Sequence, residues 1–276
     1  MSNVKQRAFL KWAGGKYGLI EPIQKRLPKG KRLVEPFVGA GSVFLNTEFE
    51  HYWLNDINQD LIDVYLWLQR DPATYIEAAA GLFIPANNDA ERYYQYREEF
   101  NCTVPGLRRA TLFLYMNRHG YNGLCRYNKK GGFNVPFGRY KRPYFPRNEL
   151  FAFAQKATRA TFTSLPFEQV FATVEQGDVV YCDPPYAPLS ATASFTAYAG
   201  NGFGLVEQQK LAEQAAMCAE DAVPVLISNH DLESTREWYR RADVTQLDVR
   251  RTISRNGKGR GKVSELLALY QLNNRR

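Results

Sequence analysis

Short apolar runs alternate with longer amphipathic stretches along much of the chain. Apolar runs of this length, bounded by polar or glycine-rich turns, are typical of buried strands. Between two of these runs, residues 205–220 have helical spacing and place Leu211, Ala215 and Cys218 on one side. Strands that alternate with helices predict an open α/β sheet with helices on both faces. The predicted strands are 32–38, 52–56, 178–182 and 223–228.

The middle of the chain has a different pattern. From Asn58 to about Asn117 the sequence is mostly helical in character, and Asp89 is placed to cap a helix over 90–100. Apolar residues in the first part of this stretch recur at helical spacing, at Leu61, Val64, Tyr65 and Leu68.

After His119 turn residues and aromatics replace the helical pattern. Residues 129–132 (Lys-Lys-Gly-Gly) lie between two short aromatic-rich segments and predict the turn of a β-hairpin. We therefore predict that residues 58–144 are inserted into one α/β domain, which residues 1–57 and 145–276 form.

The net charge of the chain is +8, which by itself excludes little. Its distribution is more informative, because the stretch 108–147 contains ten Lys or Arg residues and no Asp or Glu. Basic residues interleaved with Tyr, Phe and Asn, as they are here, favour a nucleic-acid surface over a solvated face. A second basic run, 250–262, either assists in binding or forms a surface loop. The ten basic residues are Arg108, Arg109, Arg118, Arg126, Lys129, Lys130, Arg139, Lys141, Arg142 and Arg147.

Cysteine and histidine usage predicts neither a disulfide framework nor a metal site. The three histidines are scattered, and the four cysteines form no Cys-x-x-Cys pair. The chain has no apolar run that approaches a membrane span, and its first residues lead into no long apolar stretch. We expect a reducing, cytoplasmic setting, with no membrane and no metal. The cysteines are Cys102, Cys125, Cys182 and Cys218.

A glycine turn follows the first predicted strand and precedes a helix that begins near Ser42. Gly39 and Gly41 allow the backbone to pass close to a ligand. The dinucleotide fingerprint requires a third glycine three positions later, where this chain has Phe44, so a diphosphate is disfavoured. S-adenosylmethionine contains no diphosphate and needs only the tight turn. Asp56 ends the next strand and can accept hydrogen bonds from ribose hydroxyls, or else it caps the following helix.

Two lysines flank a Trp-Ala-Gly-Gly segment near the N-terminus, Lys11 and Lys16. The spacing differs from that of a P-loop. In a methyltransferase, Trp12 and Lys16 would line the methionine end of the cofactor, where the lysine can meet a carboxylate. The alternative is a buried tryptophan beside a surface lysine.

The tetrapeptide Asp183-Pro184-Pro185-Tyr186 follows the strand 178–182 directly. Two consecutive prolines end the strand, because each lacks an N–H and has a fixed φ. The result is a stiff turn that presents one carboxylate, one carbonyl and one aromatic ring at the sheet edge. This set suits a planar amino group, which offers two hydrogens to acceptors and a face to the ring.

In the order of these motifs the chain resembles the DNA adenine methylases, and most closely the bacterial enzymes that modify GATC. The similarity runs from Arg7 to Tyr270 and includes the Lys-Trp-Ala-Gly-Gly-Lys segment, Phe-x-Gly-x-Gly, the insertion and Asp-Pro-Pro-Tyr. Further matching segments are 122–128, 133–138 and 226–231.

The resemblance implies a Rossmann-like S-adenosylmethionine methyltransferase sheet with an inserted helical and β-hairpin DNA-recognition domain. It implies methyl transfer to the 6-amino group of adenine in double-stranded GATC sites, by base flipping and direct in-line displacement. The implied catalytic residues are Asp183, Pro184 and Tyr186. The implied cofactor-binding residues are Trp12, Lys16, Phe37, Gly39, Gly41, Asp56 and Asp183.

By the same resemblance, the DNA-binding residues fall into three groups. Tyr121 would wedge into the base stack with Asn122 beside it, and the segment 190–204 would close over the extruded base. The residues that would read bases are Lys11, Leu124, Arg126 and Pro136, and those that would hold phosphates are Arg97, Asn128 and Arg139.

Three other functions share parts of this pattern. The same tetrapeptide type serves enzymes that methylate cytosine amino groups, RNA or protein glutamine. A DNA-binding protein that has lost catalysis would keep the basic stretch, and a nicotinamide-dependent enzyme would keep the glycine turn. We expect a monomer, since no helix suited to dimerisation stands out.

Overall fold

The structure is a computed structural model that describes residues 5–187, 203–249 and 263–272. The basic run 250–262 and most of the segment 190–204 lie outside these residues. The chain divides into two compact units, and the division of function between an insertion and a catalytic domain stays a prediction. One unit comprises Met1–Glu21 and Val38–Leu165, and the other comprises Pro22–Phe37 and Pro166–Arg276.

Seven strands form one sheet in the order β3-β2-β1-β4-β5-β7-β6. The pairs β2–β3, β1–β4 and β4–β5 are parallel, whereas β7 runs antiparallel to both β5 and β6. A mostly parallel sheet whose strands alternate with helices confirms the predicted Rossmann-like α/β class. The strands are β1 Arg32–Glu35, β2 His51–Asn55, β3 Ala160–Thr163, β4 Asp178–Cys182, β5 Val225–His230, β6 Asp243–Val249 and β7 Val263–Tyr270.

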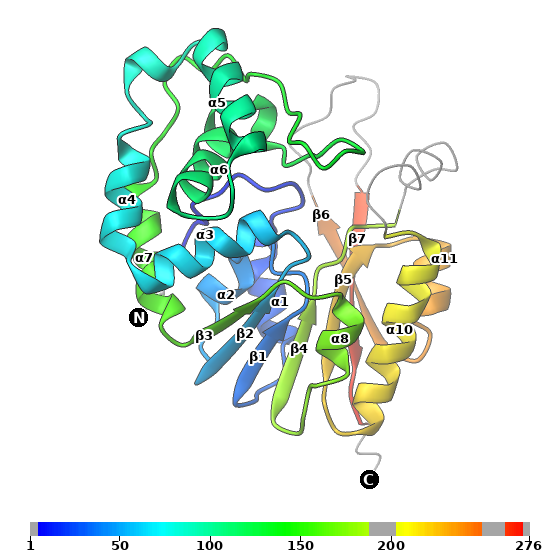
Figure 1. Ribbon diagram of the computed structural model, residues 1–276. Helices are drawn as coiled ribbons and strands as arrows, with labels where there is room; N and C mark the ends of the chain where they lie inside the picture. The colour runs from blue at the N-terminus through cyan, green and yellow to red at the C-terminus, as the bar shows by residue number, and fades with distance from the viewer. Residues whose placement is uncertain (1–4, 188–202, 250–262, 273–276) are drawn as a thin grey trace. The chain divides into compact units, whose positions relative to one another are not determined.

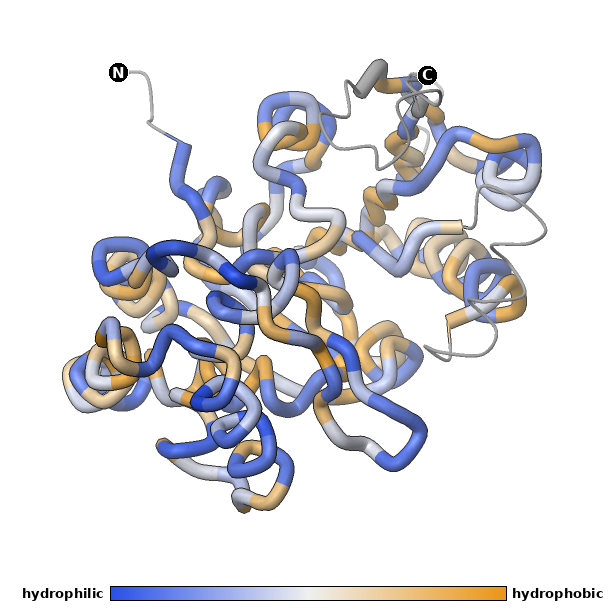
Figure 2. The backbone as a smooth tube through the Cα atoms, turned by 90° about the horizontal axis from the view of Figure 1, so that it is seen from above, coloured by the Kyte–Doolittle hydropathy of each residue, from blue (hydrophilic) through white to orange (hydrophobic). Residues whose placement is uncertain are grey.

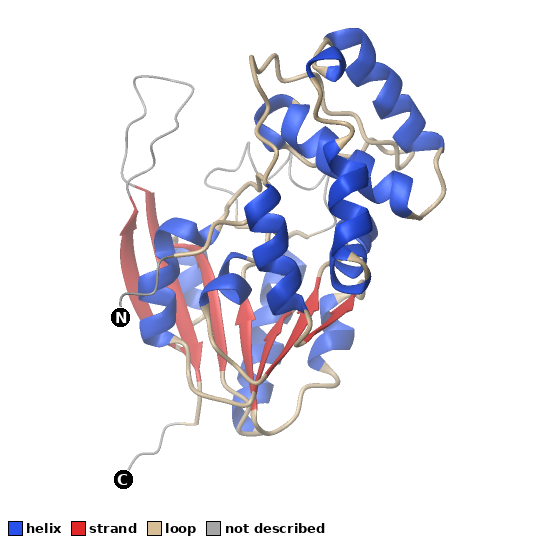
Figure 3. Ribbon diagram, turned by 90° about the vertical axis from the view of Figure 1, so that its left-hand side faces the viewer, coloured by secondary structure: helices blue, strands red, loops and turns tan. Residues whose placement is uncertain are grey.

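In the first unit, β2 and β3 are accompanied by helices that pack largely on one another (Figure 3). Helix α3 packs against α4, α6 and α7, and α6 also packs against α4 and α5. Helix α1, Ile20–Arg26, begins in this unit and ends in the other. The remaining helices of the unit are η1 Lys16–Leu19, α2 Ser42–Asn46, α3 Gln59–Arg70, α4 Pro72–Ala80, η2 Pro85–Asn87, α5 Ala90–Cys102, α6 Leu107–His119, η3 Tyr121–Gly123 and α7 Arg147–Ala157.

The second unit places its helices against the strands. Figure 1 shows α8 and α10 over one face of β4 and β5. Leu211, Ala215 and Cys218 are all buried on α10, which confirms the side of the helix predicted to face the core. Among the described residues, no helix combines the length and apolarity that crossing a bilayer requires. The helices here are α8 Phe167–Phe171, α10 Leu205–Glu220 and α11 Glu233–Trp238.

The sequence predicted most element types correctly and some boundaries less well. The predicted strand 178–182 and helix 205–220 match β4 and α10. The strand predicted over 32–38 ends at Glu35, because Pro36 cannot donate to a ladder and the chain turns there. Strand β5 begins after Pro224 and continues through the polar residues up to His230, since β7 supplies ladder partners along its whole length.

The helical pattern of the middle of the chain is confirmed. The four apolar markers on α3 are fully buried, and in Figure 2 the helices carry alternating bands of hydrophobic and hydrophilic colour. Asp89 caps α5 as predicted, because its carboxylate accepts a hydrogen bond of 2.9 Å from the backbone N–H of Arg92.

The predicted hairpin is present as a narrow antiparallel loop rather than as two full strands. Two isolated bridges join its arms, one between Tyr127 and Phe133 and the other between Gly120 and Phe137. We call residues 120–138 the recognition hairpin.

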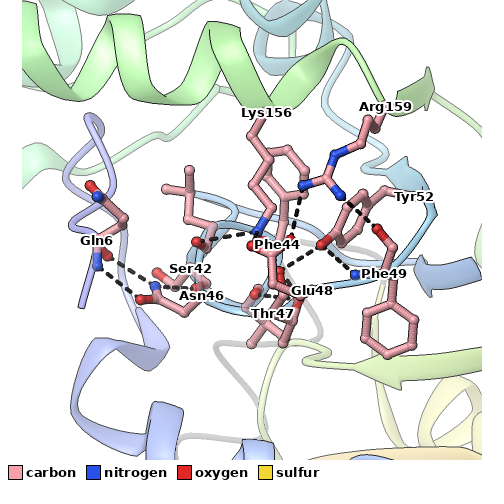
Figure 4. A network of polar contacts seen from close by, with 12 residues as sticks. Gln6, Ser42, Phe44, Asn46, Thr47, Glu48, Phe49, Tyr52, Lys156 and Arg159 are labelled. Atoms are coloured by element: carbon pink, nitrogen blue, oxygen red, sulfur yellow. Dashed lines mark hydrogen bonds and ion pairs between the residues drawn. The ribbon is translucent and has the colours of Figure 1, made fainter. Parts of the chain in front are cut away.

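A polar network fixes helix α2, which follows the glycine turn (Figure 4). Lys156 from α7 donates to the carbonyls of Leu45 and Thr47. Its ammonium also pairs with Glu48 at 3.1 Å, and the Tyr52 hydroxyl donates to the Thr47 carbonyl at 2.6 Å. The last carbonyls of a helix have no partner within the helix, and a cation there meets the negative end of the dipole. The network therefore holds α2, and with it the glycine turn, in place.

Candidate active site and nucleic-acid interface

The turn after β4, residues 183–187, carries the predicted catalytic residues, and we call it the catalytic turn. The carboxylate of Asp183 is half-buried and accepts a hydrogen bond of 3.1 Å from the hydroxyl of Ser228 on β5. Among the described residues, no group donates to the carbonyl of Pro184. The turn thus offers the two acceptors that the sequence predicted.

Tyr186 is held at both ends of its side chain. Its hydroxyl donates to the carboxylate of Glu265 on β7 at 2.8 Å, and its ring meets His230 edge-on at a centroid distance of 4.7 Å. Burial, and next the charge of Asp183, raises the pKa of the Tyr186 phenol well above its usual range, so the ring stays neutral. The ring is half-buried and rigidly oriented.

The glycine turn in the first unit is braced by Asp56. One carboxylate oxygen accepts from the Gly39 N–H and the other from the Asn58 N–H, both at 3.0 Å. Burial raises the pKa of this carboxyl. The side chain that caps α3 is that of Asn58, which accepts from the Leu61 N–H, so the interpretation of Asp56 as the helix cap is wrong.

Trp12 lies directly against the same turn. Gly39 has a φ of +48°, and a Cβ there would approach the indole nitrogen of Trp12 to 2.8 Å, so the contact requires glycine. Lys16 is buried and its ammonium donates to the Gly14 carbonyl at 2.6 Å. The alternative of a buried tryptophan beside a surface lysine is therefore wrong, because Trp12 is half-buried and Lys16 is the buried residue. Gly41, at φ +71°, begins α2.

Phe37 and Asp183, the two remaining members of the predicted cofactor set, lie in the second unit. Phe37 forms a triangle of rings with Phe167 and Phe203, at centroid distances between 5.4 and 5.6 Å. The sequence analysis did not single out Phe167 or Phe203. Such a cluster offers aromatic surface to a planar ligand.

The structure brings Lys11 to the recognition hairpin, more than a hundred residues later in the chain. Its ammonium lies 3.7 Å from the ring centroid of Tyr140 and donates to the Arg118 carbonyl at 3.4 Å. Burial, and next the charge of Arg118, lowers the Lys11 pKa. The backbone of Lys11 is bonded in both directions to the side chain of Asn117, and Gly123 packs against its Cβ so closely that only glycine fits.

The backbone is strained at two of the predicted DNA-binding residues, one in the hairpin and one directly after it. Among the described residues only three non-glycine residues have positive φ, and two of them are Asn122 and Arg139, each at +54°. Such strain collects at functional sites and persists where neighbours impose it. Here the Asn122 N–H donates to the Tyr140 hydroxyl at 3.0 Å, while Tyr121 beside it is 38% exposed.

Arg126 is oriented by a residue across the hairpin. Its Nε and Nη2 donate to the side chain and backbone oxygens of Asn134, at 2.8 and 3.1 Å. Two of its donors are thereby used to fix the guanidinium plane, which leaves the end formed by Nη1 and the second Nη2 hydrogen directed away from Asn134. Leu124, nearby, is half-buried and Pro136 is exposed.

The predicted phosphate-binding residues lie on or beside the hairpin. The Asn128 side chain accepts from the N–H groups of Lys130 and Gly132, at 2.9 and 3.0 Å, and so shapes the hairpin turn. Arg97 reaches from α5 and donates to the Val135 carbonyl at 3.3 Å. The sequence alone gave no indication that these two side chains also support the hairpin backbone.

Comparisons with known proteins agree on one family. A family model described as the D12 class N6 adenine-specific DNA methyltransferases matches residues 12–253. The chain belongs to this family. It is 60% identical to the DNA adenine methylase of Escherichia coli K12 over 267 residues, which is 97% of this chain and 96% of the relative. The DNA adenine methylases of Vibrio cholerae and Serratia marcescens are 59% and 56% identical, each over at least 96% of both chains.

The protein is therefore an adenine-specific DNA methyltransferase that acts on N6 of adenine with a methyl donor, and the other substrates considered from the sequence are set aside. A solved precorrin 8w decarboxylase from Methanobacterium thermoautotrophicum overlays 97% of the chain at 10% identity, with a TM-score of 0.40. In the described part of the methyltransferase no three His, Cys, Asp or Glu side chains lie together as a metal site would require.

A half-buried polar cluster ties the recognition hairpin of the methyltransferase to the start of α3. Tyr127 donates to Asp60 at 2.7 Å, and Arg109 of α6 pairs with the same carboxylate at 2.6 Å. Asn58, which caps α3, donates to the sulfur of Cys125 at 3.3 Å. The loop before α3 and the first turn of this helix therefore carry Asp56, which braces the glycine turn, and the two residues that anchor the hairpin, Asn58 and Asp60.

Sequence reasoning missed the residues that orient others, since their chemistry is ordinary. Ser228 and Glu265 hold two catalytic-turn side chains, Asn134 holds Arg126, and Asp60 holds Tyr127. The matching segment 226–231 pointed to the neighbourhood of Ser228 without assigning it a role.

We predict that Tyr127→Phe loosens the recognition hairpin. The substitution removes a hydrogen bond to the half-buried carboxylate of Asp60, and a hydrogen bond to a charged group is worth about 1.5–3 kcal/mol. Amide hydrogens between residues 125 and 134 should exchange faster, and DNA affinity should fall while cofactor affinity stays unchanged.

Tyr144→Phe is the matched control for this prediction. It removes the Tyr144 hydroxyl, which donates to the carboxylate of Glu149. Tyr144 is 56% exposed, and bonds at exposed positions contribute little to stability. Equal exchange rates in the two variants would contradict the anchoring role of Tyr127.

Proposed function

We propose that this methyltransferase modifies adenine within GATC sites of duplex DNA, uses S-adenosylmethionine, and flips the target base out of the helix. The observation that carries the proposal is the catalytic turn. It offers the Asp183 carboxylate and the Pro184 carbonyl as acceptors, next to the fixed ring of Tyr186.

These three groups suit the exocyclic amine of adenine. The two oxygens accept its two hydrogens, which leaves the nitrogen lone pair to attack in line. The carboxylate offsets the positive charge that develops on nitrogen during attack. Correct orientation of this kind can supply roughly 7–11 kcal/mol in favourable cases.

Base flipping gives a role to two aromatic residues, Tyr186 and Tyr121. An adenine inside a duplex cannot reach a donor, and unstacking it costs a few kcal/mol. Stacking on Tyr186 returns about 1–3 kcal/mol. Tyr121 is exposed on a strained part of the recognition hairpin and suits the gap that the base leaves.

The predicted cofactor residues fit the chemistry of S-adenosylmethionine, part by part. The Lys16 ammonium suits the methionine carboxylate, the Asp56 carboxylate suits the ribose hydroxyls, and the rings around Phe37 suit adenine. When bound, the cofactor would supply a methyl group activated by a sulfonium. Trp12 packs on the glycine turn and would border the methionine end.

Arg126 suits the recognition of guanine. Asn134 already holds one edge of its guanidinium, so the remaining pair of donors is oriented before DNA arrives. Two parallel donors match O6 and N7 of guanine, a contact worth about 1–3 kcal/mol of discrimination. Lys129 and Lys130 are exposed at the hairpin turn and suit backbone phosphates.

The site assignment is tested by digestion of DNA that lacks prior methylation. After incubation with the protein and S-adenosylmethionine, nucleases that cut only methylated GATC should cleave it, and those that methylation blocks should not. Mass spectrometry of the nucleosides should find N6-methyladenine. A duplex with one base of GATC changed is the control, and equal methylation of both duplexes would refute the site.

Asp183→Ala should lower kcat by at least about 10²–10³-fold, as expected when a group that stabilises transition-state charge is lost. DNA binding by the variant should stay close to that of the wild type in a mobility-shift titration. Loss of binding in a folded variant would instead assign Asp183 a structural role.

Arg126→Ala should relax the base preference, whereas Lys129→Ala should weaken binding to all sequences alike and reduce the salt dependence. Both variants are compared on GATC and on singly substituted duplexes at several salt concentrations. The same effect from both substitutions would contradict the division between base reading and phosphate binding.

A further inference from the structure

A buried amide pair supports the catalytic turn from the side of α10. The side chain of Gln208 donates to the Pro185 carbonyl at 2.7 Å. The side chain of Asn229, on β5, accepts from the Ala187 N–H at 3.1 Å. The two amides are joined by a bond of 3.0 Å from Asn229 Nδ2 to Gln208 Oε1. Gln208 is 2% exposed and Asn229 is fully buried.

The backbone dictates the orientation of both amides. Asn229 Oδ1 accepts from two N–H groups, those of Ala187 and His230, and a backbone N–H can only donate. Its Nδ2 must therefore face Gln208 and the Tyr239 hydroxyl, which lies 2.9 Å away. Gln208 must then present Oε1 to Asn229, and its Nε2 is left to meet the Pro185 carbonyl, which can only accept.

The contacts of this pair lie on both sides of Tyr186, and one of them directly follows Pro184. Pro185 follows the Pro184 carbonyl and precedes Tyr186, and Ala187 follows Tyr186. Neither proline has an N–H, so the turn makes few hydrogen bonds within itself. His230 adds one more contact, because its Nδ1 lies 2.8 Å from the Ala187 carbonyl and must carry a proton to donate to it.

We propose that Gln208 and Asn229 are positioning residues for methyl transfer. They touch none of the three groups assigned to the adenine, and act by fixing the backbone directly after Pro184, at Pro185, and on both sides of Tyr186, at Pro185 and Ala187. This inference rests on the proposed catalytic role of the turn. A shift of the reacting groups by about 1 Å can cost around 10²-fold in rate, so a lost bond at Pro185 reduces kcat while binding of DNA and cofactor is kept.

The test is Gln208→Glu, which keeps the shape of the side chain and its acceptor for Asn229. An ionised carboxylate cannot donate to the Pro185 carbonyl and repels it, whereas the protonated acid restores the donor. Burial raises the pKa of such a carboxyl toward the working range. Near pH 8.5 we expect the kcat of the variant to be about 10²-fold lower than that of the wild type. The ratio of variant to wild-type kcat should rise as the pH falls toward about 6. KM for DNA should change by less than about twofold, because binding surfaces are untouched.

Gln209→Glu is the matched control, since it adds the same charge to the next residue of α10, where the side chain is exposed. Its kcat and pH profile should match those of the wild type. A purely structural loss in Gln208→Glu would lower activity in proportion to folded protein at every pH, and a constant ratio to wild type would therefore overturn the proposal.

Asn229→Asp provides an independent variant should Gln208→Glu fail to fold. It keeps the acceptor for Ala187 and His230 but presents an oxygen to Gln208, which must reverse its amide and turn Oε1 toward the Pro185 carbonyl. The same loss of kcat and the same recovery at low pH are expected. Wild-type kcat at high pH in both variants would overturn the positioning role, provided that Asp183→Ala is inactive. An active Asp183→Ala would instead show that the turn is not catalytic, and both proposals would fail.

Discussion

The catalytic turn can make few hydrogen bonds within itself, and the site depends on the neighbouring residues that supply them. Two prolines end β4 abruptly and stiffen the turn, but they also remove two backbone donors. Three consecutive residues of β5 supply what is missing: Ser228 holds the Asp183 carboxylate, while Asn229 and His230 hold the Ala187 backbone. Strand β5 therefore fixes the position of the turn, and β5 is itself held by strands on both sides, β4 and β7.

In the first unit, the loop between β2 and α3 and the first turn of α3 also support two features at once. Asp56 braces the glycine turn, Asn58 caps the helix and touches Cys125, and Asp60 receives Tyr127 and Arg109. A few residues thus connect a turn suited to a cofactor with a hairpin suited to DNA. The pairing of the half-buried Asp60 carboxylate with both an arginine and a phenol reduces the cost of withdrawing its charge from water.

Much of the architecture was predictable because its causes are local. The apolar runs of β4 and β5, the spacing of buried residues on α3 and the cap at Asp89 follow from period and side-chain chemistry alone. The predicted strand boundaries were wrong where pairing with a neighbouring strand decides the boundary. Strand β5 continues beyond its predicted end at Ser228 through Asn229 and His230, which are too polar to suggest a strand, because β7 pairs with both of them.

The sequence by itself determined which groups are available for chemistry: a carboxylate and carbonyl on a rigid turn, glycines at a strand end, and arginines among aromatics in the stretch 108–147. These groups can be recognised in the sequence because few other residue types could supply the same chemistry. Only the tertiary structure decided which side chains orient them. Gln208, Asn134 and Glu265 are unremarkable in the sequence, and each matters through hydrogen bonds to a residue distant in the chain or across the hairpin. Hydrogen bonds depend on position and angle, which the folded backbone sets and a linear pattern does not encode.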